Sequence, residues 1–414
     1  MEIEIFFIFF VVKKNKSYYI IFLEDYIMKK IKPSLKQRLS YQSIKNYLKP
    51  EIKKMYSFSV PPFDLKGPFL IVSSKVTSVD QFIIMLSFSQ YIYFMYNENI
   101  YRNDPENAKK QEIFGNIPYK LASPISWYKD KVLKLLHDGN NVCVYPELYT
   151  NYDGVTSPID KEIGALVKEA GCTLVTYCFT GGYLTEPAWA KNKRKGWING
   201  HIVNVYSKYD LERLEPDKIT KMIERDLDED AYARQCNSPI KYPGEGLAEG
   251  IENIYYTCVN CGAIDSYEAK GNDYHCTKCE ARGSYTDQGL THANFRFKTV
   301  TDYLAWEEMQ IERMADSEID YNEENVQAFT INDDHTLTKV LEGKMHVDKK
   351  GITIASQLFE FADILKMDVD DKATSLVFSY GDKTYKVTKD NFKPLKYRKL
   401  FYKRKASIET YGNK

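Results

Sequence analysis

Four cysteines near the middle of the chain place the tightest constraint on how it can fold. Cys258 and Cys261 form one Cys-x-x-Cys pair, Cys276 and Cys279 form a second, and 14 residues separate the two pairs. Two such pairs on tight turns bring four thiolates around one tetrahedral Zn²⁺ ion, with a short hairpin between them. The spacing therefore predicts a small zinc ribbon with these four ligands. Four sulfurs leave no open coordination position, so the zinc is expected to be structural.

The composition indicates a folded protein in a reducing compartment. Of 414 residues, 43% are hydrophobic, and 57 basic residues balance 57 acidic ones. This balance gives no reason to expect a nucleic-acid partner. The eight cysteines come without a convincing secretion signal, so we expect a cytoplasmic protein without a disulfide framework. The length predicts about two to four domains.

The first 55 residues combine short apolar runs with a basic segment. Residues 5–12 and 18–23 are apolar, but a membrane-spanning helix needs about 20 such residues. We interpret residues 5–12 either as a short membrane-surface anchor or as an extension upstream of a true start at Met28. Residues 29–54 carry nine Lys or Arg against one acid and predict one or two amphipathic helices, interrupted at Pro50. Residues 1–55 are therefore predicted to be a membrane-surface segment.

Two further basic stretches each have two interpretations. Residues 393–405 are basic and interleaved with aromatic residues, and they predict either a solvated face or a contact with an anionic membrane. The basic loop 191–195 predicts either a solvated loop or a contact with a phosphate head group.

Residues 69–88 change from strand-like to helix-like across a short polar turn, which we call the elbow. Apolar residues suited to a strand cover 69–72, and Ser73, Ser74 and Lys75 follow. Apolar side chains then recur at near-helical spacing, and Asp80 stands where the helix would begin, a favoured place for an acidic residue. Alone, this pattern indicates an ordinary strand-to-helix turn with a capping aspartate.

A second stretch downstream changes that interpretation. The apolar strand at residues 142–145 ends in Pro146 and Glu147, and a polar loop follows. Strands and helices alternate around it through residues 56–250, which predicts an α/β layer fold with its informative loops at strand ends.

Together, the elbow and the Tyr145-Pro146-Glu147 strand end resemble the phospholipid/glycerol acyltransferase (1-acylglycerol-3-phosphate acyltransferase-like) family over about residues 56–249. In that family, an Asn-His-x-x-x-x-Asp block follows an apolar strand, and a Phe-Pro-Glu-Gly block binds glycerol phosphate. The resemblance implies acyl transfer from acyl-CoA or acyl carrier protein to the lysophospholipid 1-acylglycerol 3-phosphate. It also implies a catalytic role for Asp80 and a substrate-binding role for Pro146 and Glu147.

The chain departs from the family pattern at the position of the general base. Lys75 replaces the motif His, and none of the six histidines lies in the elbow. An unperturbed lysine has a pKa of about 10.4, so it is a poor proton acceptor at neutral pH. Further departures are Ser74 for Asn, Lys120 for the usual Arg, Tyr145 for Phe and Leu148 for Gly. Two functions therefore stay open: an acyltransferase with impaired catalysis, or an inactive lipid-binding or scaffold pseudoenzyme with the ribbon as its interaction module.

After residue 324, the chain consists of short strand-like runs separated by turns. These strands loosely resemble pleckstrin-homology-like barrels; the alternative is a β-rich domain that only packs on the rest. The complete prediction is a cytoplasmic, peripheral membrane protein with an acyltransferase-type sheet flanked by helices. Its expected parts are the membrane-surface segment (1–55), the acyltransferase-like domain (56–250), the zinc ribbon (251–300), a helical linker (301–324) and the small β-domain (325–414).

Overall fold

The computed structural model divides into two compact units, residues 1–32 and 33–414. The residues it describes are 8–14, 17–23, 30–57, 63–291, 296–370 and 372–412. In the first unit, strands β1 (Ile8–Lys14) and β2 (Ser17–Leu23) form an antiparallel hairpin. Residues 5–7 of the predicted anchor and the suggested start at Met28 lie outside the described residues.

The second unit begins with helix α1 (Leu35–Met55), which continues through Pro50. The expected interruption at Pro50 is therefore wrong. Ser34 caps the helix by accepting a hydrogen bond from the Gln37 backbone N–H at 3.2 Å, while the Gln37 side chain accepts one from the Ser34 N–H at 2.8 Å. Pro50 is exposed, so water can satisfy the carbonyl that lost its helical donor.

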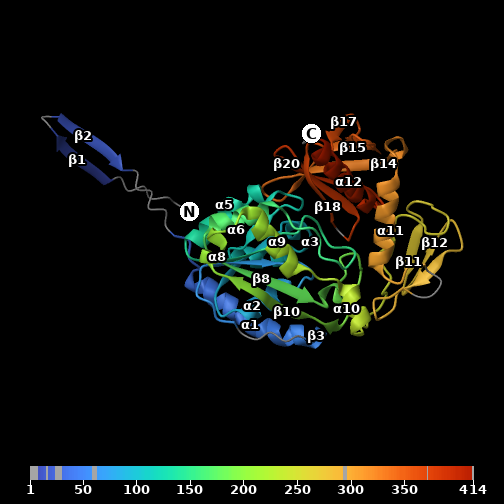
Figure 1. Ribbon diagram of the computed structural model, residues 1–414, viewed down its shortest axis with the longest axis horizontal. Helices are drawn as coiled ribbons and strands as arrows, with labels where there is room; N and C mark the ends of the chain where they lie inside the picture. Colours follow the sequence, from blue (N-terminus) through green and yellow to red (C-terminus); the bar gives the residue numbers. More distant parts are fainter. Residues whose placement is uncertain are drawn as a thin grey trace. The chain divides into compact units, whose positions relative to one another are not determined.

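A six-stranded sheet in the order β10-β8-β4-β7-β5-β6 forms the centre of the next part (Figure 1). β10 runs antiparallel to β8, and the other neighbours are parallel. The strands are β4 (Phe69–Ser73), β5 (Ile92–Asn97), β6 (Ile117–Tyr119), β7 (Asn141–Val144), β8 (Thr173–Thr180) and β10 (Asn199–Tyr206). A small parallel pair, β3 (Tyr56–Ser57) and β9 (Gly196–Trp197), lies apart from this sheet.

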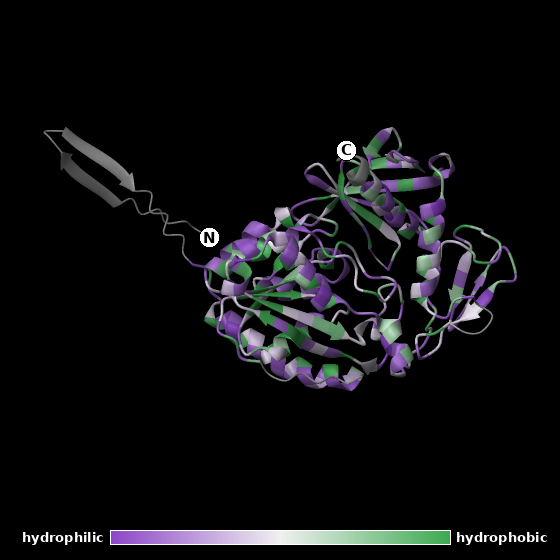
Figure 2. Cartoon of the chain, viewed as in Figure 1, coloured by the Kyte–Doolittle hydropathy of each residue, from purple (hydrophilic) through white to green (hydrophobic). Residues whose placement is uncertain are grey.

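Helices cover both faces of this sheet. Alternate residues of β4 point to opposite sides: Leu70 and Val72 join the core on one face, whereas Phe69 and Ile71 join the core on the other face, beneath α1. Figure 2 shows hydrophobic residues along these strands and mixed colours on the covering helices. The covering helices are α2 (Asp80–Ser87), α5 (Lys129–His137), α6 (Glu162–Ala170) and α9 (Pro216–Leu227). Shorter helices are α3 (Ile100–Asn103), α4 (Pro105–Ile113), α7 (Gly182–Thr185), α8 (Lys208–Glu212) and α10 (Ala231–Asn237). We call residues 35–250 the α/β domain.

A three-stranded antiparallel sheet and the cysteine-bearing turns beside it are together called the ribbon below. Its strands are β11 (Tyr267–Lys270), β12 (Asp273–Cys276) and β13 (Arg282–Ser284). Helix α11 (Val300–Arg313) follows, within the segment that we expected to be a linker. Its inner face is buried: the Tyr303 ring stacks on Tyr255 at 3.8 Å, and its hydroxyl donates to the Thr257 carbonyl at 2.6 Å.

The C-terminal part, called the β-domain below, is a seven-stranded antiparallel sheet followed by one helix. The sheet order is β17-β16-β15-β14-β20-β19-β18. The helix, α12 (Leu395–Gly412), packs Leu400 and Phe401 into the core, with the Phe401 ring 5.9 Å from that of Phe361. The strands are β14 (Tyr321–Ile331), β15 (Leu337–Val347), β16 (Gly351–Ile354), β17 (Gln357–Glu360), β18 (Ile364–Asp370), β19 (Ser375–Tyr380) and β20 (Lys383–Thr388).

The basic stretch at residues 393–405 is packed into this part, so both expectations for it are wrong. Arg398 is buried and forms an ion pair with Asp368 at 3.0 Å. Lys396 is also buried, and its amine lies 3.4 Å from the Glu323 carboxylate. Lys403 donates to the Glu312 carbonyl at 2.9 Å, at the end of α11. The basic side chains thus neutralise buried acids and cap carbonyls. Within the described residues, no helix combines the length and apolar character needed to cross a membrane.

Candidate functional site

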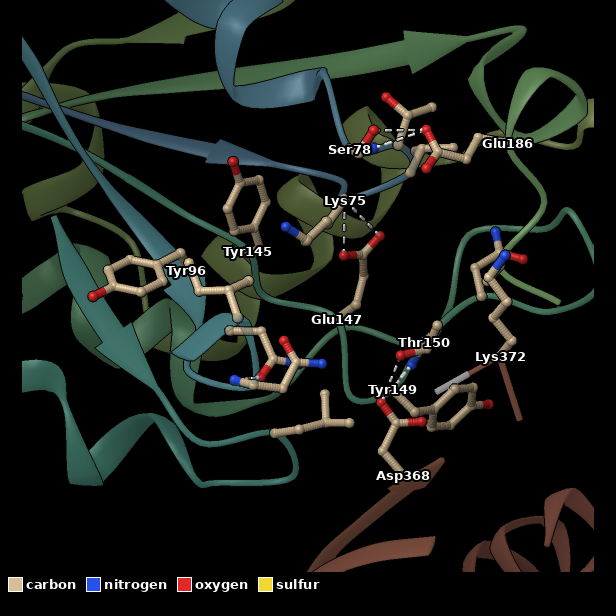
Figure 3. Close-up of a pocket in the computed structure, with 18 of the residues that line it drawn as sticks. Lys75, Ser78, Tyr96, Tyr145, Glu147, Tyr149, Thr150, Glu186, Asp368 and Lys372 are labelled. Atoms are coloured by element: carbon tan, nitrogen blue, oxygen red, sulfur yellow. Dashed lines mark hydrogen bonds between the residues drawn. The ribbon is translucent and has the colours of Figure 1, made fainter. Parts of the chain in front are cut away.

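A pocket of about 440 Å³ lies at the carboxyl ends of β4 and β7 (Figure 3). Carboxyl ends of parallel strands share one edge of a sheet, and the loops after them are the usual place for a ligand site in an α/β fold. The elbow supplies Lys75, Thr77 and Ser78 to the wall, and the loop after β7 supplies Glu147 and Thr150. The two stretches that sequence reasoning singled out therefore meet at one pocket.

Asp80 lies beneath the elbow and is absent from the described lining of the pocket. Its buried carboxylate accepts hydrogen bonds from the backbone N–H groups of Val76 and Thr77 and from the Thr77 hydroxyl. Burial raises the pKa of Asp80 to about 6, and the hydrogen bonds from Thr77 and Val76 act in the opposite direction. In this arrangement, Asp80 fixes the turn of the elbow.

Lys75 presents its side chain to the pocket. Its ammonium lies 5.2 Å from the centre of the Tyr145 ring, a cation–π contact. Among the described residues, this ammonium has neither a hydrogen bond nor an ion pair. A cation held by an aromatic face is available to an anionic ligand.

Glu147 joins the loop after β7 to the elbow. Its carboxylate oxygens lie 3.0 and 3.3 Å from the backbone nitrogen of Lys75, which donates to them. Burial raises the pKa of Glu147 to about 8, against the effect of that donor. Pro146 is absent from the described lining, and its carbonyl accepts a hydrogen bond from the Asp160 N–H at 2.8 Å. Of the two predicted substrate-binding residues, only Glu147 faces the pocket.

No histidine belongs to the described pocket lining. His201 is on β10, opposite Cys178, and burial lowers its pKa. Lys120, which we compared with a basic residue of the resembled family, forms an ion pair with Asp333 at 2.9 Å and does not line the pocket. The described wall therefore offers no imidazole as a proton acceptor.

Sequence reasoning missed the residues that the β-domain contributes to the pocket. Lys366, Asp368 and Lys372, from β18 and just after it, line the same pocket as Glu147. Nothing in their local sequence signals this role, because they are more than 200 positions from Glu147. The loop at Lys191 and Lys193, which we considered for phosphate contact, also lines the pocket.

The pocket carries more positive than negative side chains. Five lysines face three carboxylates in the described lining: Lys75, Lys191, Lys193, Lys366 and Lys372 against Glu147, Glu186 and Asp368. The raised pKa of Glu147 reduces the negative charge further near neutral pH. Lys191 already pairs with Glu252 at 3.2 Å, Lys193 with Glu186 at 3.2 Å, and Lys366 with Asp160. The positive charge that favours an anionic ligand therefore comes mainly from Lys75 and Lys372.

The four cysteines of the ribbon converge as their spacing predicts. All four Sγ atoms lie within 4.8 Å of one another. The Cys258–Cys279 and Cys261–Cys276 separations are 3.7 and 3.8 Å. Zinc–sulfur bonds of about 2.3 Å in a tetrahedron require sulfurs about 3.8 Å apart. The group could therefore hold one metal ion, and a sulfur-only set favours zinc.

The fold and pocket define an α/β protein with a pocket at the strand ends, a four-cysteine ribbon and an antiparallel β-domain. The chain matches no family model and no curated protein sequence. Among solved structures, it is similar to the 1-acyl-sn-glycerophosphate (LPA) acyltransferase PlsC from Thermotoga maritima. The match has 13% identity and a TM-score of 0.41, and it covers 49% of this chain and 81% of that chain.

Proposed function

We propose that this chain is an acyltransferase-like protein that binds a phosphate-bearing lysophospholipid, such as 1-acylglycerol 3-phosphate, and has impaired acyl transfer. One observation carries the proposal: an ammonium, Lys75, occupies the place where the reaction needs a base. Acyl transfer to a hydroxyl requires removal of its proton as it attacks the acyl donor. A protonated lysine cannot accept that proton, but it can bind a phosphate.

The surroundings of Lys75 support a binding role. Asp80, which would orient an imidazole in the resembled family, is instead engaged by Thr77 and Val76. Lys75 and Lys372, which have no carboxylate partner among the described ion pairs, supply positive charge suited to a phosphate ester. Both observations fit a site that retains recognition of the head group while lacking the base.

A second candidate function is slow acyl transfer with Glu147 as the proton acceptor. The pKa of about 8 gives Glu147 a more basic carboxylate than an ordinary glutamate, and Glu147 faces the pocket. This role requires acyl-CoA or acyl carrier protein as donor. A carboxylate with such a pKa is a competent general base near neutral pH.

Two further parts of the proposal concern membrane and partner contacts. Helix α1 carries lysines beside the exposed apolar residues Leu35 and Leu39, which suits peripheral binding to an anionic membrane. The β-domain has seven antiparallel strands and a terminal helix, the arrangement expected of a pleckstrin-homology-like module. We assign the ribbon a structural zinc ion.

The test compares 1-acylglycerol 3-phosphate with monoacylglycerol, which lacks the phosphate, as ligands of the purified full chain. We expect Lys75→Ala to weaken binding of the phosphorylated lipid about tenfold, the effect of losing one charged contact. Lys218→Ala, an exposed lysine on α9, is the matched control and should bind as the wild type does. Equal affinity for both lipids would contradict the proposal.

A labelled acyl donor in the same mixture separates the two functions. Under the first proposal, the wild type should show at most trace turnover that Glu147→Gln does not change, and Lys75→His should increase it. Turnover by the wild type that Glu147→Gln abolishes would instead support the second candidate.

A further inference from the structure

The β-domain supplies one wall of the ligand pocket. Strand β18 places Asp368 against Thr150, three residues beyond Glu147 in the loop after β7 (Figure 3). The Thr150 N–H and hydroxyl each donate to the same Asp368 carboxylate oxygen at 2.8 Å. Because both donors belong to Thr150 and the accepting carboxylate is buried, the contact fixes the backbone and the side chain of Thr150 together.

Arg398 of helix α12 completes this contact. Its guanidinium donates to the other Asp368 oxygen at 3.0 Å and to the Thr150 carbonyl at 2.8 Å. The N–H, hydroxyl and carbonyl of Thr150 are therefore all bound by two buried residues of the β-domain. The ion pair is well satisfied, because each charge has additional hydrogen-bond partners.

Neighbouring contacts extend the same attachment along the pocket. The Tyr152 hydroxyl donates to the Val369 carbonyl at 3.1 Å. The Lys372 amine donates to the carbonyls of Ala190 and Lys191, both at 2.7 Å. Lys372 has a φ of 60°, a conformation that non-glycine residues keep only where the surroundings impose it. One strand of the β-domain and the turn after it thus hold two separate loops of the pocket.

We infer that the ligand site is composite and that Asp368, supported by Arg398, is a positioning residue for the loop carrying Glu147 and Thr150. The inference rests on the proposed function for the identity of the ligand. A loop that becomes ordered only on binding loses conformational entropy at that moment. By ordering the loop beforehand, the β-domain increases the affinity of the pocket.

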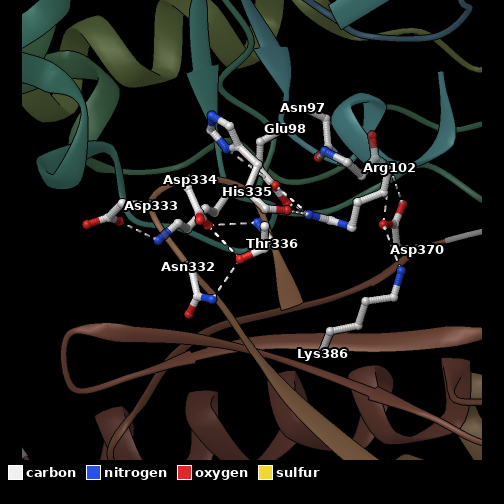
Figure 4. A network of polar contacts seen from close by, with 12 residues as sticks. Asn97, Glu98, Arg102, Asn332, Asp333, Asp334, His335, Thr336, Asp370 and Lys386 are labelled. Carbon is white, nitrogen blue, oxygen red and sulfur yellow. Dashed lines mark hydrogen bonds and ion pairs between the residues drawn. The ribbon is translucent and has the colours of Figure 1, made fainter. Parts of the chain in front are cut away.

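The control comes from a second contact between the same domains (Figure 4). There, Arg102 pairs with Glu98 at 2.7 Å and donates to the His335 carbonyl at 2.7 Å, and Lys120 pairs with Asp333 at 2.9 Å. Neither Lys120 nor Asp333 lines the pocket. Asp333→Ala therefore removes one exposed polar contact between the domains while leaving the Thr150 contacts intact.

The experiment measures two quantities in the full chain: amide hydrogen exchange at residues 148–152 without ligand, and affinity for 1-acylglycerol 3-phosphate. We expect Asp368→Asn to speed exchange in this loop, but not in β4, and to weaken binding about tenfold. Thr150→Val keeps the Asp368–Arg398 pair, so it tests the same contact if Asp368→Asn does not fold. Thr150→Ser keeps the hydroxyl that Thr150→Val lacks, so its loop exchange and its affinity should match those of the wild type. Asp333→Ala should change neither quantity.

Unchanged loop exchange in Asp368→Asn and Thr150→Val would overturn the inference. If Asp333→Ala speeds exchange in this loop as much as Asp368→Asn does, the assignment to Asp368 is overturned. Contact between the two domains as a whole would then order the loop. If the wild type binds no lysophospholipid, the proposed function fails, and loop exchange alone supports or overturns the positioning role.

Discussion

The backbone nitrogen of Lys75 donates to both carboxylate oxygens of Glu147, at 3.0 and 3.3 Å, across 72 positions of sequence. This contact joins the elbow to the loop after β7 and holds a carboxylate of raised pKa at the pocket wall. The contact fixes the position of Glu147, while burial raises the pKa of its carboxyl to about 8.

Glu147 should make folding stability fall with increasing pH. Its pKa is about 8 in the folded protein against 4.5 ordinarily, so between these values the folded state keeps a proton that the unfolded chain has released. The stabilisation is complete below about pH 4.5 and is lost as pH rises through 8. Between pH 5 and 9, the free energy of unfolding should therefore decrease by about 4 kcal/mol less in Glu147→Gln than in the wild type. Urea denaturation at each pH measures it, and parallel curves for the two proteins would contradict the raised pKa.

Asp80 should matter for stability even if it has no chemical role. Asp80→Ala leaves three donors of the elbow without their acceptor, two of them on Thr77, at a buried position. We expect a loss of about 3 kcal/mol in the free energy of unfolding. Asp104→Ala is the comparison, since Asp104 accepts one exposed hydrogen bond at the start of α4, and should cost about 1 kcal/mol. Similar losses for both variants would show that the elbow does not depend on Asp80.

The ribbon should contain about one zinc ion per chain. Elemental analysis of protein purified without chelator measures the content, and Cys276→Ser should lower it. Cys236→Ser replaces an exposed cysteine on α10 and should leave it unchanged. Chelation should lower the unfolding temperature, because the free energy of metal binding contributes to folding. If elemental analysis finds no metal in the wild-type protein, the zinc assignment is wrong.

Helix α1 should bind anionic vesicles if it forms the proposed membrane surface. Leu39, which is 60% exposed, and Lys53 lie on its solvent side. Leu39→Asp and Lys53→Glu should each weaken sedimentation with phosphatidylserine vesicles, Lys53→Glu by about tenfold. Lys218→Glu on α9 makes the same charge change elsewhere and should have little effect. Binding that does not depend on phosphatidylserine would exclude an electrostatic surface.

Local patterns in the sequence were sufficient to predict features whose residues lie close together in the chain. The cysteine spacing predicted that the four sulfurs converge, because two tight turns and one short hairpin allow few other arrangements. The strand-to-helix change predicted β4, the elbow and α2 for the same reason. The α/β alternation placed the elbow and Glu147 at strand ends, where both are found.

Features that depend on distant partners were decided only by the tertiary structure. The basic stretch at 393–405 looked like a surface because its partners, such as Asp368 for Arg398, lie on other elements. Asp368 and Thr150 are 218 positions apart, so no local pattern could indicate that the β-domain closes the pocket. The sequence by itself determined the four-cysteine site and the absence of a histidine from the elbow. Tertiary packing decided which charges are neutralised inside and which remain for a ligand, because burial and pairing depend on neighbours that the chain brings together only when folded.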